Sequence, residues 1–542
     1  LSRLIMKKLK FISLLSLGAL LLLTSCGGGG KVKNGGGTKN KVGMNGWKAN
    51  DSKGWFFSGK QQKPKGWPNM VYVGGGTFTM GLVKDDVMHD WNNSPRRMQV
   101  SSFFIGEAEI TNADYRSYVT WLKFVFPPSD PSFKNIYNGA LPDTLVWNNK
   151  LSKNDYAETY FRSPEYDNYP VVGVSWQQAS RYCDWLTDRA NEHELMKQGV
   201  IAKNYYTSDT NNQGANAFNL DKFKANDPEL DAYVNKQRLQ KKSGIKTSNA
   251  RIQSANRNAT AGLVTKFRLP TEVEWEYAAL GLQKNREYNN YLGKLPEIEK
   301  LRGKKGSKRG LYLENFKQGR GDYSGVGGWN NDGSPTTADV RQYPSNDLGI
   351  YGMYGNVAEW TADVYRPIID EEASDFNYYR GNVPQQTVKN SDGTYKKVDA
   401  KGMKYERLAD GREIYQGLPG SYERKTVEDQ RNYRDGDFMS SLEAGYGKEV
   451  DSATADYNMY NAPKSLFIVD DKGRVILQKD RKPRTTLVSN SVRVIKGGSW
   501  KDTSYWLDPG QRRFKDESKS FGWVGFRVAQ DAKDANNKRS KR

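Results

Sequence analysis

Residues that could carry redox or metal chemistry are few in this chain of 542 residues, which contains two cysteines, Cys26 and Cys183, and two histidines, His89 and His193. Copper(I) is a soft ion held by thiolates, so a copper oxidase would need a pair of free cysteines. The surroundings of Cys26 predict lipidation, and Cys183 has the spacing of a core residue on a helix, so no such pair remains. Oxygen ligands are plentiful, which leaves hard cations such as calcium as candidates.

Five short motifs with many glycine, aromatic and acidic residues follow one another along the chain. They are Gly75–Gly81 (GGTFTMG), Glu109–Asn112 (EITN), Arg268–Ala278 (RLPTEVEWEYA), Tyr351–Thr361 (YGMYGNVAEWT) and Ile495–Ala529, which opens with IKGGSW and ends with GWVGFRVA. In this order they resemble the motifs of the sulfatase-modifying factor, or formylglycine-generating enzyme, family over about residues 67–530. The resemblance implies a loop-rich α+β fold of the C-type-lectin-like kind. We expect two long insertions in it, at about 193–263 and 366–491.

The resemblance also indicates where catalytic atoms would stand. In the family, two cysteines after the G-G-S-[WY] motif bind copper and perform the oxidation, and Asp502 and Leu507 stand at those positions here. A sister group on the same fold binds iron through three histidines, and this chain has two. The resemblance therefore implies a domain that is not an enzyme and has no catalytic residues. The acidic residues of Arg268–Ala278 are expected to be helix-start and structural groups, because no second titratable partner is recognisable.

Two calcium sites are implied by the resemblance, since calcium needs only oxygen ligands, including backbone carbonyls. One would use the carbonyls of Gly355 and Val357 and the carboxylate of Glu359, with Gly352 in place of a side-chain ligand. The other would use the following oxygens: the side chain of Asn315, the carbonyl of Phe316, the carboxylate of Asp332 and the carbonyl of Ser334. The alternative for Glu359 is a carboxylate bonded to backbone amides in a tight loop, and the sequence leaves both open.

The N-terminus has the form of a bacterial lipoprotein signal. Met6–Lys10 is basic, Phe11–Leu23 is apolar, and Leu23–Cys26 matches a lipobox. The apolar run is too short to span a bilayer. We expect residues 1–25 to be removed and Cys26 to carry diacylglyceryl and acyl chains, each buried methylene contributing about 0.8 kcal/mol to membrane anchoring. The lack of acidic residues just after Cys26 favours the periplasmic face of the outer membrane.

The segments at the two ends have compositions unlike that of the middle. Residues 26–66 are rich in glycine, lysine and asparagine, as in a flexible tether, and residues 531–542 are expected to be a basic, disordered tail. The net charge of +21 would suggest nucleic acid for a cytoplasmic protein. An exported protein instead meets anionic lipid, peptidoglycan or acidic partner proteins, so we expect no nucleic-acid partner and contacts through the insertions.

Local patterns predict three amphipathic helices and several strands. The first helix is expected to begin at Thr111 or Asn112, either of which can cap it, and the other two at the capping residues Ser175 and Thr271. Their buried faces are expected to hold Tyr115, Tyr118, Val119 and Leu122 in the first, Ala179, Tyr182, Cys183 and Leu186 in the second, and Trp275, Ala278, Ala279 and Leu282 in the third. The expected β-structure is a hairpin over residues 70–81, a buried strand over 169–174, a hairpin over 467–477 and a closing strand over 525–528.

A closer resemblance lies in segments outside the five motifs. Asp85–Pro95, Phe126–Pro128 and Asn135–Gly139 with Pro142–Trp147 resemble the GldJ family of gliding-motility lipoproteins, which joins a lipobox to a domain of this kind. This implies a structural lipoprotein of the type IX secretion and gliding machinery, with GldK-type lipoproteins and periplasmic ring components as partners. Two alternatives stay open: a glycan- or peptidoglycan-binding module, and an enzyme of the formylglycine-generating type or with an unrecognised site.

Overall fold

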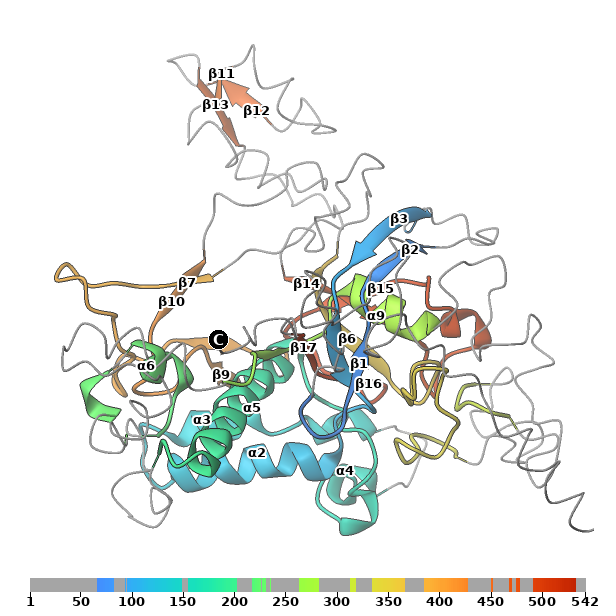
Figure 1. Cartoon of the computed structure of the whole chain (residues 1–542), viewed down its shortest axis with the longest axis horizontal. Coiled ribbons are helices and arrows are strands. Elements are labelled where there is room, and N and C mark those ends of the chain that lie inside the picture. The colour runs from blue at the N-terminus through green and yellow to red at the C-terminus, as the bar shows by residue number, and fades with distance from the viewer. Residues whose placement is uncertain are drawn as a thin grey trace, which may run out of the picture. The chain divides into compact units, whose positions relative to one another are not determined.

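The computed structural model describes residues that belong to one compact unit, Gly66–Lys533 (Figure 1). The described residues are 66–81, 93, 95–148, 155–201, 217–225, 227–230, 234, 263–281, 312–317, 334–365, 385–426, 450–451, 467–469, 474–477 and 491–532. The expected signal peptide, Cys26, most of the tether, His89, Asp332 and the end of the tail lie outside them. Among the described helices, none has the length and apolar character that a membrane span requires.

Two four-stranded sheets organise the fold. Their strands are β1 (Met70–Val73), β4 (Phe103–Gly106), β5 (Phe267–Arg268), β6 (Ala358–Val364), β14 (Val492–Lys496), β15 (Arg513–Asp516), β16 (Val524–Gly525) and β17 (Ala529–Asp531). One sheet has the order β1-β4-β17-β5 and is antiparallel throughout. The other has the order β15-β14-β6-β16, with β16 parallel to β6 and the other neighbours antiparallel. The C-terminal segment thus supplies strands to both sheets.

Three expected β-features differ from the structure. Residues 70–81 do not form a hairpin, because β1 pairs with β4 while β2 (Gly76–Met80) pairs with β3 (Arg96–Val100). The chain passes from the four-stranded sheet of β1 to the two-stranded sheet of β2 and β3 at Gly75, where a Cβ atom would lie 2.5 Å from the Val100 carbonyl oxygen. Of the closing strand expected over 525–528, only Gly525 lies in a strand, β16, and residues 526–528 connect β16 to β17. Residues 169–174 form one isolated bridge, between Pro170 and Thr111, in place of a strand.

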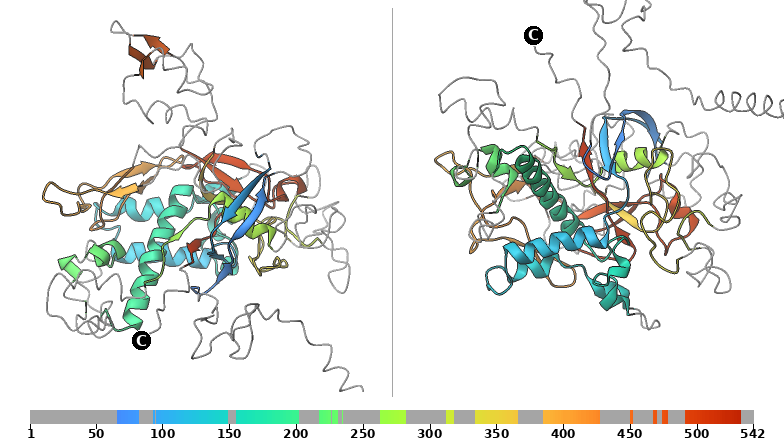
Figure 2. Two further views of the ribbon diagram at one scale, coloured as in Figure 1. Left: turned by 45° about the horizontal axis from the view of Figure 1, so that its top comes forward. Right: turned by 60° about the horizontal axis from the view of Figure 1, so that its bottom comes forward.

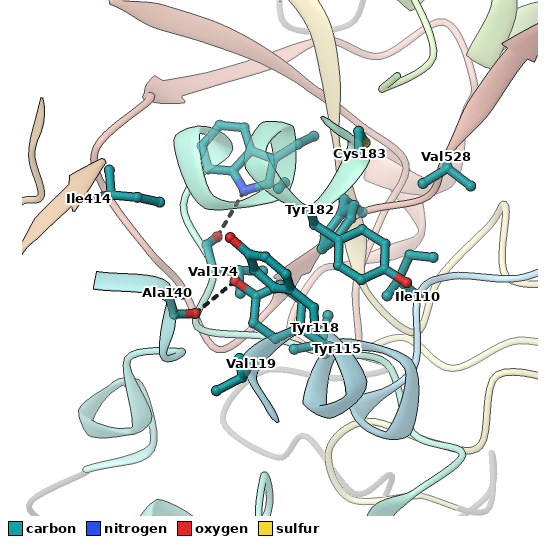
Figure 3. Packing of buried hydrophobic residues seen from close by; sticks show 14 of the residues in the cluster. Ile110, Tyr115, Tyr118, Val119, Ala140, Val174, Tyr182, Cys183, Ile414 and Val528 are labelled. Carbon is teal, nitrogen blue, oxygen red and sulfur yellow. Dashed lines mark hydrogen bonds between the residues drawn. The ribbon is translucent and has the colours of Figure 1, made fainter. Parts of the chain in front are cut away.

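The three amphipathic helices are confirmed, although Leu186 is only partly buried and Leu282 lies outside the described residues. They are α2 (Asn112–Val125), α5 (Trp176–Lys197) and α9 (Glu272–Leu280), and each begins with the expected cap residue in a complete capping box. α2 and α5 pack through the tyrosine-rich core in Figure 3, where the Tyr115 hydroxyl donates to the Ala140 carbonyl at 2.9 Å. Cys183 is 2% exposed in this core, and burial raises the pKa of its thiol, so its predicted role as a core residue is confirmed.

The remaining described elements are shorter. The helical ones are α3 (Lys134–Ala140), α4 (Tyr156–Thr159), α6 (Leu220–Ala225), η1 (Thr144–Trp147), η2 (Pro164–Tyr166), η5 (Pro228–Leu230) and η12 (Ser504–Leu507). The remaining strands are β7 (Gln385–Thr387), β8 (Tyr405–Arg407), β9 (Glu413–Tyr415), β10 (Arg424–Thr426), β11 (Val450–Asp451), β12 (Phe467–Val469) and β13 (Arg474–Leu477). The predicted hairpin over 467–477 is confirmed as the antiparallel pair β12–β13.

Parts of the two expected insertions contact each other and the core. Arg424 on β10 pairs with Asp221 of α6 at 2.7 Å. Lys397, which precedes β8 in the same expected insertion, pairs with Asp227 at 2.8 Å. The hairpin of β8 and β9 buries Ile414 completely, and its Tyr415 hydroxyl lies 2.6 Å from the Tyr118 hydroxyl of α2. This part of residues 366–491 therefore contributes to the core. Figure 2 shows the ribbon of the chain from two further sides.

Candidate functional site

Asp502, at the first position where an oxidase of this family would need a cysteine, is part of a local ion pair. Its carboxylate accepts a hydrogen bond from Arg513 Nη1 at 2.7 Å and another from the Ser499 hydroxyl. The Asp502 carbonyl accepts from the backbone of Lys317 at 2.8 Å. A carboxylate is a hard ligand and cannot replace the soft thiolate that copper(I) requires.

Leu507, at the second position, is an apolar core residue. Its side chain is fully buried and packs against Phe316 and Tyr312. The approach to Gly498 is so close that a Cβ atom there would lie 2.6 Å from Leu507 Cδ2. The two positions therefore hold a salt bridge and a packed leucine, neither of which has a redox function.

The Leu507→Ala variant is expected to lose about 2 to 5 kcal/mol of unfolding free energy, since it leaves a cavity between Gly498 and Phe316. Leu507→Met, which keeps the volume, should lose less than about 1.5 kcal/mol. Urea unfolding of the purified chain measures both. Equal losses in the two variants would mean that packing at this position does not matter.

An arginine stacked between two tryptophans lies beside Asp502. The Arg513 guanidinium is 4.7 Å from the ring centre of Trp506 and 4.6 Å from that of Trp523, and it donates to the Gly497 carbonyl at 3.0 Å. Trp500 stacks on Trp147 at 6.1 Å, and its indole donates to the Gly522 carbonyl. We call Trp147, Trp500, Trp506, Arg513 and Trp523 the aromatic rim; Trp500, Trp506 and Trp523 are half-buried. Trp500 and Trp506 were expected from the sequence as the aromatic residues of a glycan-binding alternative, whereas no local signal connects Arg513 with Trp523.

The residues expected to bind calcium meet in part at one buried junction. Asn315 donates from Nδ2 to the Thr336 carbonyl at 2.7 Å, and its own carbonyl accepts from the Asn356 backbone at 2.9 Å. Asn356 in turn bonds both backbone groups of Ala338. Asn315, the 334–338 segment and the loop containing Gly355 and Val357 are therefore adjacent, whereas Asp332 lies outside the described residues. Phe316 faces Leu507 with its ring.

Glu359 is bound by protein donors. Both of its oxygens accept from Arg527, at 2.6 Å from Nε and 2.5 Å from Nη2, and Oε2 also accepts from the Trp275 indole at 2.8 Å. All three side chains are completely buried. Arg527 also donates to the carbonyls of Gly106 and Tyr351, so it links the loop to both sheets. Arg527 was not among the site residues expected from the sequence, although an arginine in the apolar GFRVA segment is itself a signal of a buried partner.

Glu109 is a second buried carboxylate at this junction, and it lacks such a partner. The residue is 2% exposed. Its Oε1 accepts a hydrogen bond from Asn356 Nδ2 at 3.2 Å, and Oε2 has no hydrogen-bond donor among the described residues. Burial and the Glu359 charge raise the pKa of Glu109 to about 8, against the opposing effect of Arg527. Burial also raises the pKa of Glu314, with Glu109 adding to the effect. The raised pKa means that the Glu109 carboxyl group takes up a proton more readily than an exposed glutamate does.

No group of three or more histidine, cysteine, aspartate or glutamate side chains within the described residues is arranged to hold a metal ion. Any cation at the junction would therefore depend on amide and backbone oxygens as well as carboxylates. Such mixed ligand sets are ordinary for calcium and unsuitable for copper(I).

A buried charge network ties α9 to the C-terminal segment. Glu272 accepts from Arg512 at 2.6 and 2.9 Å, Glu276 accepts from Lys496 at 3.0 Å, and the Asp363 carboxylate accepts from the Glu272 backbone. Arg512 lowers the pKa of Glu272 to about 2 despite its burial. These contacts support the structural role expected for the acidic residues of α9.

Asp363 should give stability a pH dependence. Burial and the neighbouring Glu272 raise the pKa of Asp363 to about 7, so its stabilising contribution is complete below the unfolded pKa and is lost as pH rises through the folded value. We expect the free energy of unfolding to fall less steeply between about pH 4 and pH 8 in Asp363→Asn than in the unsubstituted chain, because asparagine does not titrate. Asparagine can still accept the hydrogen bond from the Glu272 amide, so the local contact is kept. Unfolding in urea at several pH values tests this, and parallel pH profiles would contradict it.

Comparison with known proteins supports the resemblance at family level. The model of the sulfatase-modifying factor enzyme 1-like domain matches residues 57–408. The formylglycine-generating enzyme of Mus musculus is 23% identical over 317 residues, which are 56% of this chain and 59% of the enzyme. The inactive C-alpha-formylglycine-generating enzyme 2 of Bos taurus is 23% identical over 314 residues, 55% of this chain and 71% of the relative.

The solved structure of PvdO from Pseudomonas aeruginosa is 14% identical and aligns with 85% of this chain and 94% of PvdO at a TM-score of 0.36. The chain spans 59% of the length of the mouse enzyme, and the family includes both active and inactive members. The family model covers more than half of the 542 residues. The chain therefore belongs to the sulfatase-modifying factor enzyme 1-like domain family.

Proposed function

We propose that this protein is a non-enzymatic structural lipoprotein of the type IX secretion and gliding machinery. The non-enzymatic part of the proposal rests on the two positions where the family's oxidases have cysteines. In this chain Asp502 is paired with Arg513 at the first position, and Leu507 is packed in the core at the second. The inactive relative from Bos taurus makes such a role compatible with the family.

The cellular part of the proposal rests on the sequence. The lipobox at Cys26 supports an anchor in the periplasmic face of the outer membrane, and the GldJ-like segments support partnership with GldK-type lipoproteins and periplasmic ring components. The net charge of +21 suits contact with acidic partner proteins or with peptidoglycan. Structural calcium at the junction of Asn315 and the Gly355–Glu359 loop would join loops of a domain that has no disulfide framework.

Depletion of the protein in its native host tests this function. We expect type IX cargo in the medium and colony spreading both to fall, together with the level of the GldK-type lipoprotein. Expression of the chain from a plasmid should restore all three, whereas a Cys26→Ala chain, which lacks the anchor, should not. Normal secretion and spreading after depletion would refute the proposal.

Glycan binding is the second candidate, because the aromatic rim offers stacked, half-buried rings next to a charged pair, as sugar-binding surfaces often do. Pull-down with peptidoglycan tests it. Trp500→Ala and Trp506→Ala should reduce binding, while Phe124→Ala, which removes an exposed ring on α2 outside the rim, should not. Equal binding by all variants would exclude the rim as a glycan site.

A further inference from the structure

The small sheet of β7 and β10 turns one face toward the rest of the fold and the other toward solvent (Figure 1). Tyr422, just before β10, is 8% exposed, and Arg424 on β10 pairs with Asp221 of α6. These two side chains therefore lie on the inner face. Successive side chains of an extended segment point to opposite faces, so Glu423 and Lys425 lie on the outer face.

Lysines outnumber carboxylates on this outer face. Glu423 accepts from Lys396 at 2.8 Å and from Lys404 at 2.7 Å, and these two lysine side chains are 52% and 65% exposed. Lys425 is exposed as well and stands opposite the exposed Gln386 in the strand register. We call Gln386, Lys396, Lys404, Glu423 and Lys425 the lysine face. Its three lysines share one carboxylate, so the lysine face is positively charged.

The composition of the lysine face favours an anionic lipid surface over a folded protein partner. Protein interfaces concentrate aromatic and other apolar residues at their centre and contain few lysines. None of the five residues of the lysine face is aromatic or apolar, and Tyr422 lies on the inner side, with its ring 5.1 Å from that of Tyr395. Exposed lysine–glutamate pairs are weak, so Lys396 and Lys404 can exchange Glu423 for a lipid phosphate. Lysine suits such a contact because its ammonium is a point charge on a flexible stem.

We propose that the lysine face docks the folded unit on the anionic phospholipid headgroups of the membrane that holds the protein. The inference rests on the lipid anchor at Cys26 proposed above, and it adds an orientation to that anchor. Acyl chains keep a protein at a bilayer without deciding which of its faces lies against the lipid. Lysine side chains near an anionic bilayer add attraction at one place, and the lysine face would thus select the side of the fold that meets the membrane.

Vesicle binding by the mature chain, residues 26–542, tests the proposal. The chain carries Cys26→Ala, so that no acyl anchor contributes to binding. We expect it to bind vesicles made of equal parts of phosphatidylcholine and phosphatidylglycerol, and to bind pure phosphatidylcholine much less. Lys396→Gln, Lys404→Gln and Lys425→Gln together should weaken binding to the anionic vesicles at least tenfold, since each lysine near the surface contributes to the attraction. Added salt should weaken the binding of the unsubstituted face.

A second triple variant controls for the charge of the whole chain. Lys123→Gln, Lys134→Gln and Lys197→Gln remove exposed lysines of α2, α3 and α5 and lower the net charge by the same amount. This variant should bind like the chain with all its lysines. Equal weakening in the two triple variants would overturn the proposal, because the attraction would then belong to the net charge. Binding to peptidoglycan sacculi without binding to anionic vesicles would also overturn it.

A fluorescent label reports which face meets the lipid. Cys183 is 2% exposed, so in the Cys26→Ala chain an environment-sensitive dye should react selectively with a new cysteine at Gln386→Cys. Its emission should shift to shorter wavelength on anionic vesicles, whereas a dye at Thr120→Cys, on the exposed side of α2, should not respond. Equal shifts at both positions would contradict a defined orientation. These measurements use purified protein and vesicles, so their failure is distinguishable from a failure of the secretion and gliding test.

Discussion

Arg527→Met is expected to lower the free energy of unfolding by about 3 to 5 kcal/mol, because it removes one partner of a fully buried ion pair. The Glu359 carboxylate would keep only the Trp275 indole as a donor, and the carbonyls of Gly106 and Tyr351 would lose their bonds to the guanidinium. Methionine retains much of the side-chain length, so the effect reports charge and hydrogen bonding more than volume. Urea unfolding of the purified chain measures it.

Arg341→Met is the control for Arg527→Met. Arg341 pairs with Glu107 at 3.5 Å near the surface, and breaking such a pair costs about 0 to 1 kcal/mol. The double variant Arg527→Met with Glu359→Gln should recover part of the loss, since it removes the unpaired charge. An Arg527→Met variant as stable as Arg341→Met would show that the buried pair does not hold the two sheets together.

Lys496→Met is expected to cost a similar amount, about 3 to 5 kcal/mol. Lys496 is completely buried on β14, bonds Glu276 at 3.0 Å and lies 3.7 Å from Glu272, so its loss leaves two α9 carboxylates with fewer positive neighbours. Glu276 would keep the bond from the Gly81 backbone. Denaturant titration followed by tryptophan fluorescence is the measurement.

A double variant of Lys496 and Glu276 tests whether the unpaired charge causes the loss of stability. Lys496→Met with Glu276→Gln should be more stable than Lys496→Met alone, because the glutamine oxygen can still accept from Gly81 while the buried charge is gone. A double variant less stable than the single one would contradict the view that the remaining charge causes the loss.

The helices of this fold could be predicted from the sequence because their signals are local. Thr111, Ser175 and Thr271 each stand three residues before the side chain that completes their capping box. Strand pairing is not local, and here the prediction was partly wrong. β4 takes partners from both ends of the chain, β1 and β17, and nothing in residues 70–81 indicates that their two strands join different sheets.

The residue types of the candidate site could be predicted from the sequence, but the ion pairs and hydrogen bonds that these residues form could not. The residue types at Asp502 and Leu507 are enough to exclude a thiolate pair there, whatever the fold. The Arg527–Glu359 and Arg512–Glu272 pairs join residues 168 and 240 positions apart, so spacing alone could not reveal them. The same limit applies to Glu109, which contacts Gly352 across a large separation in sequence.

The most direct test of the central claim is an oxidation assay of the purified chain. The protein is loaded with copper(I), freed of excess metal and incubated with oxygen and a cysteine-containing sulfatase peptide, with a formylglycine-generating enzyme as the positive control. We predict no stoichiometric copper binding and no conversion of the peptide thiol to an aldehyde by mass spectrometry. Copper-dependent aldehyde formation by this chain would contradict the claim that Asp502 and Leu507 have turned the catalytic segment into a structural one.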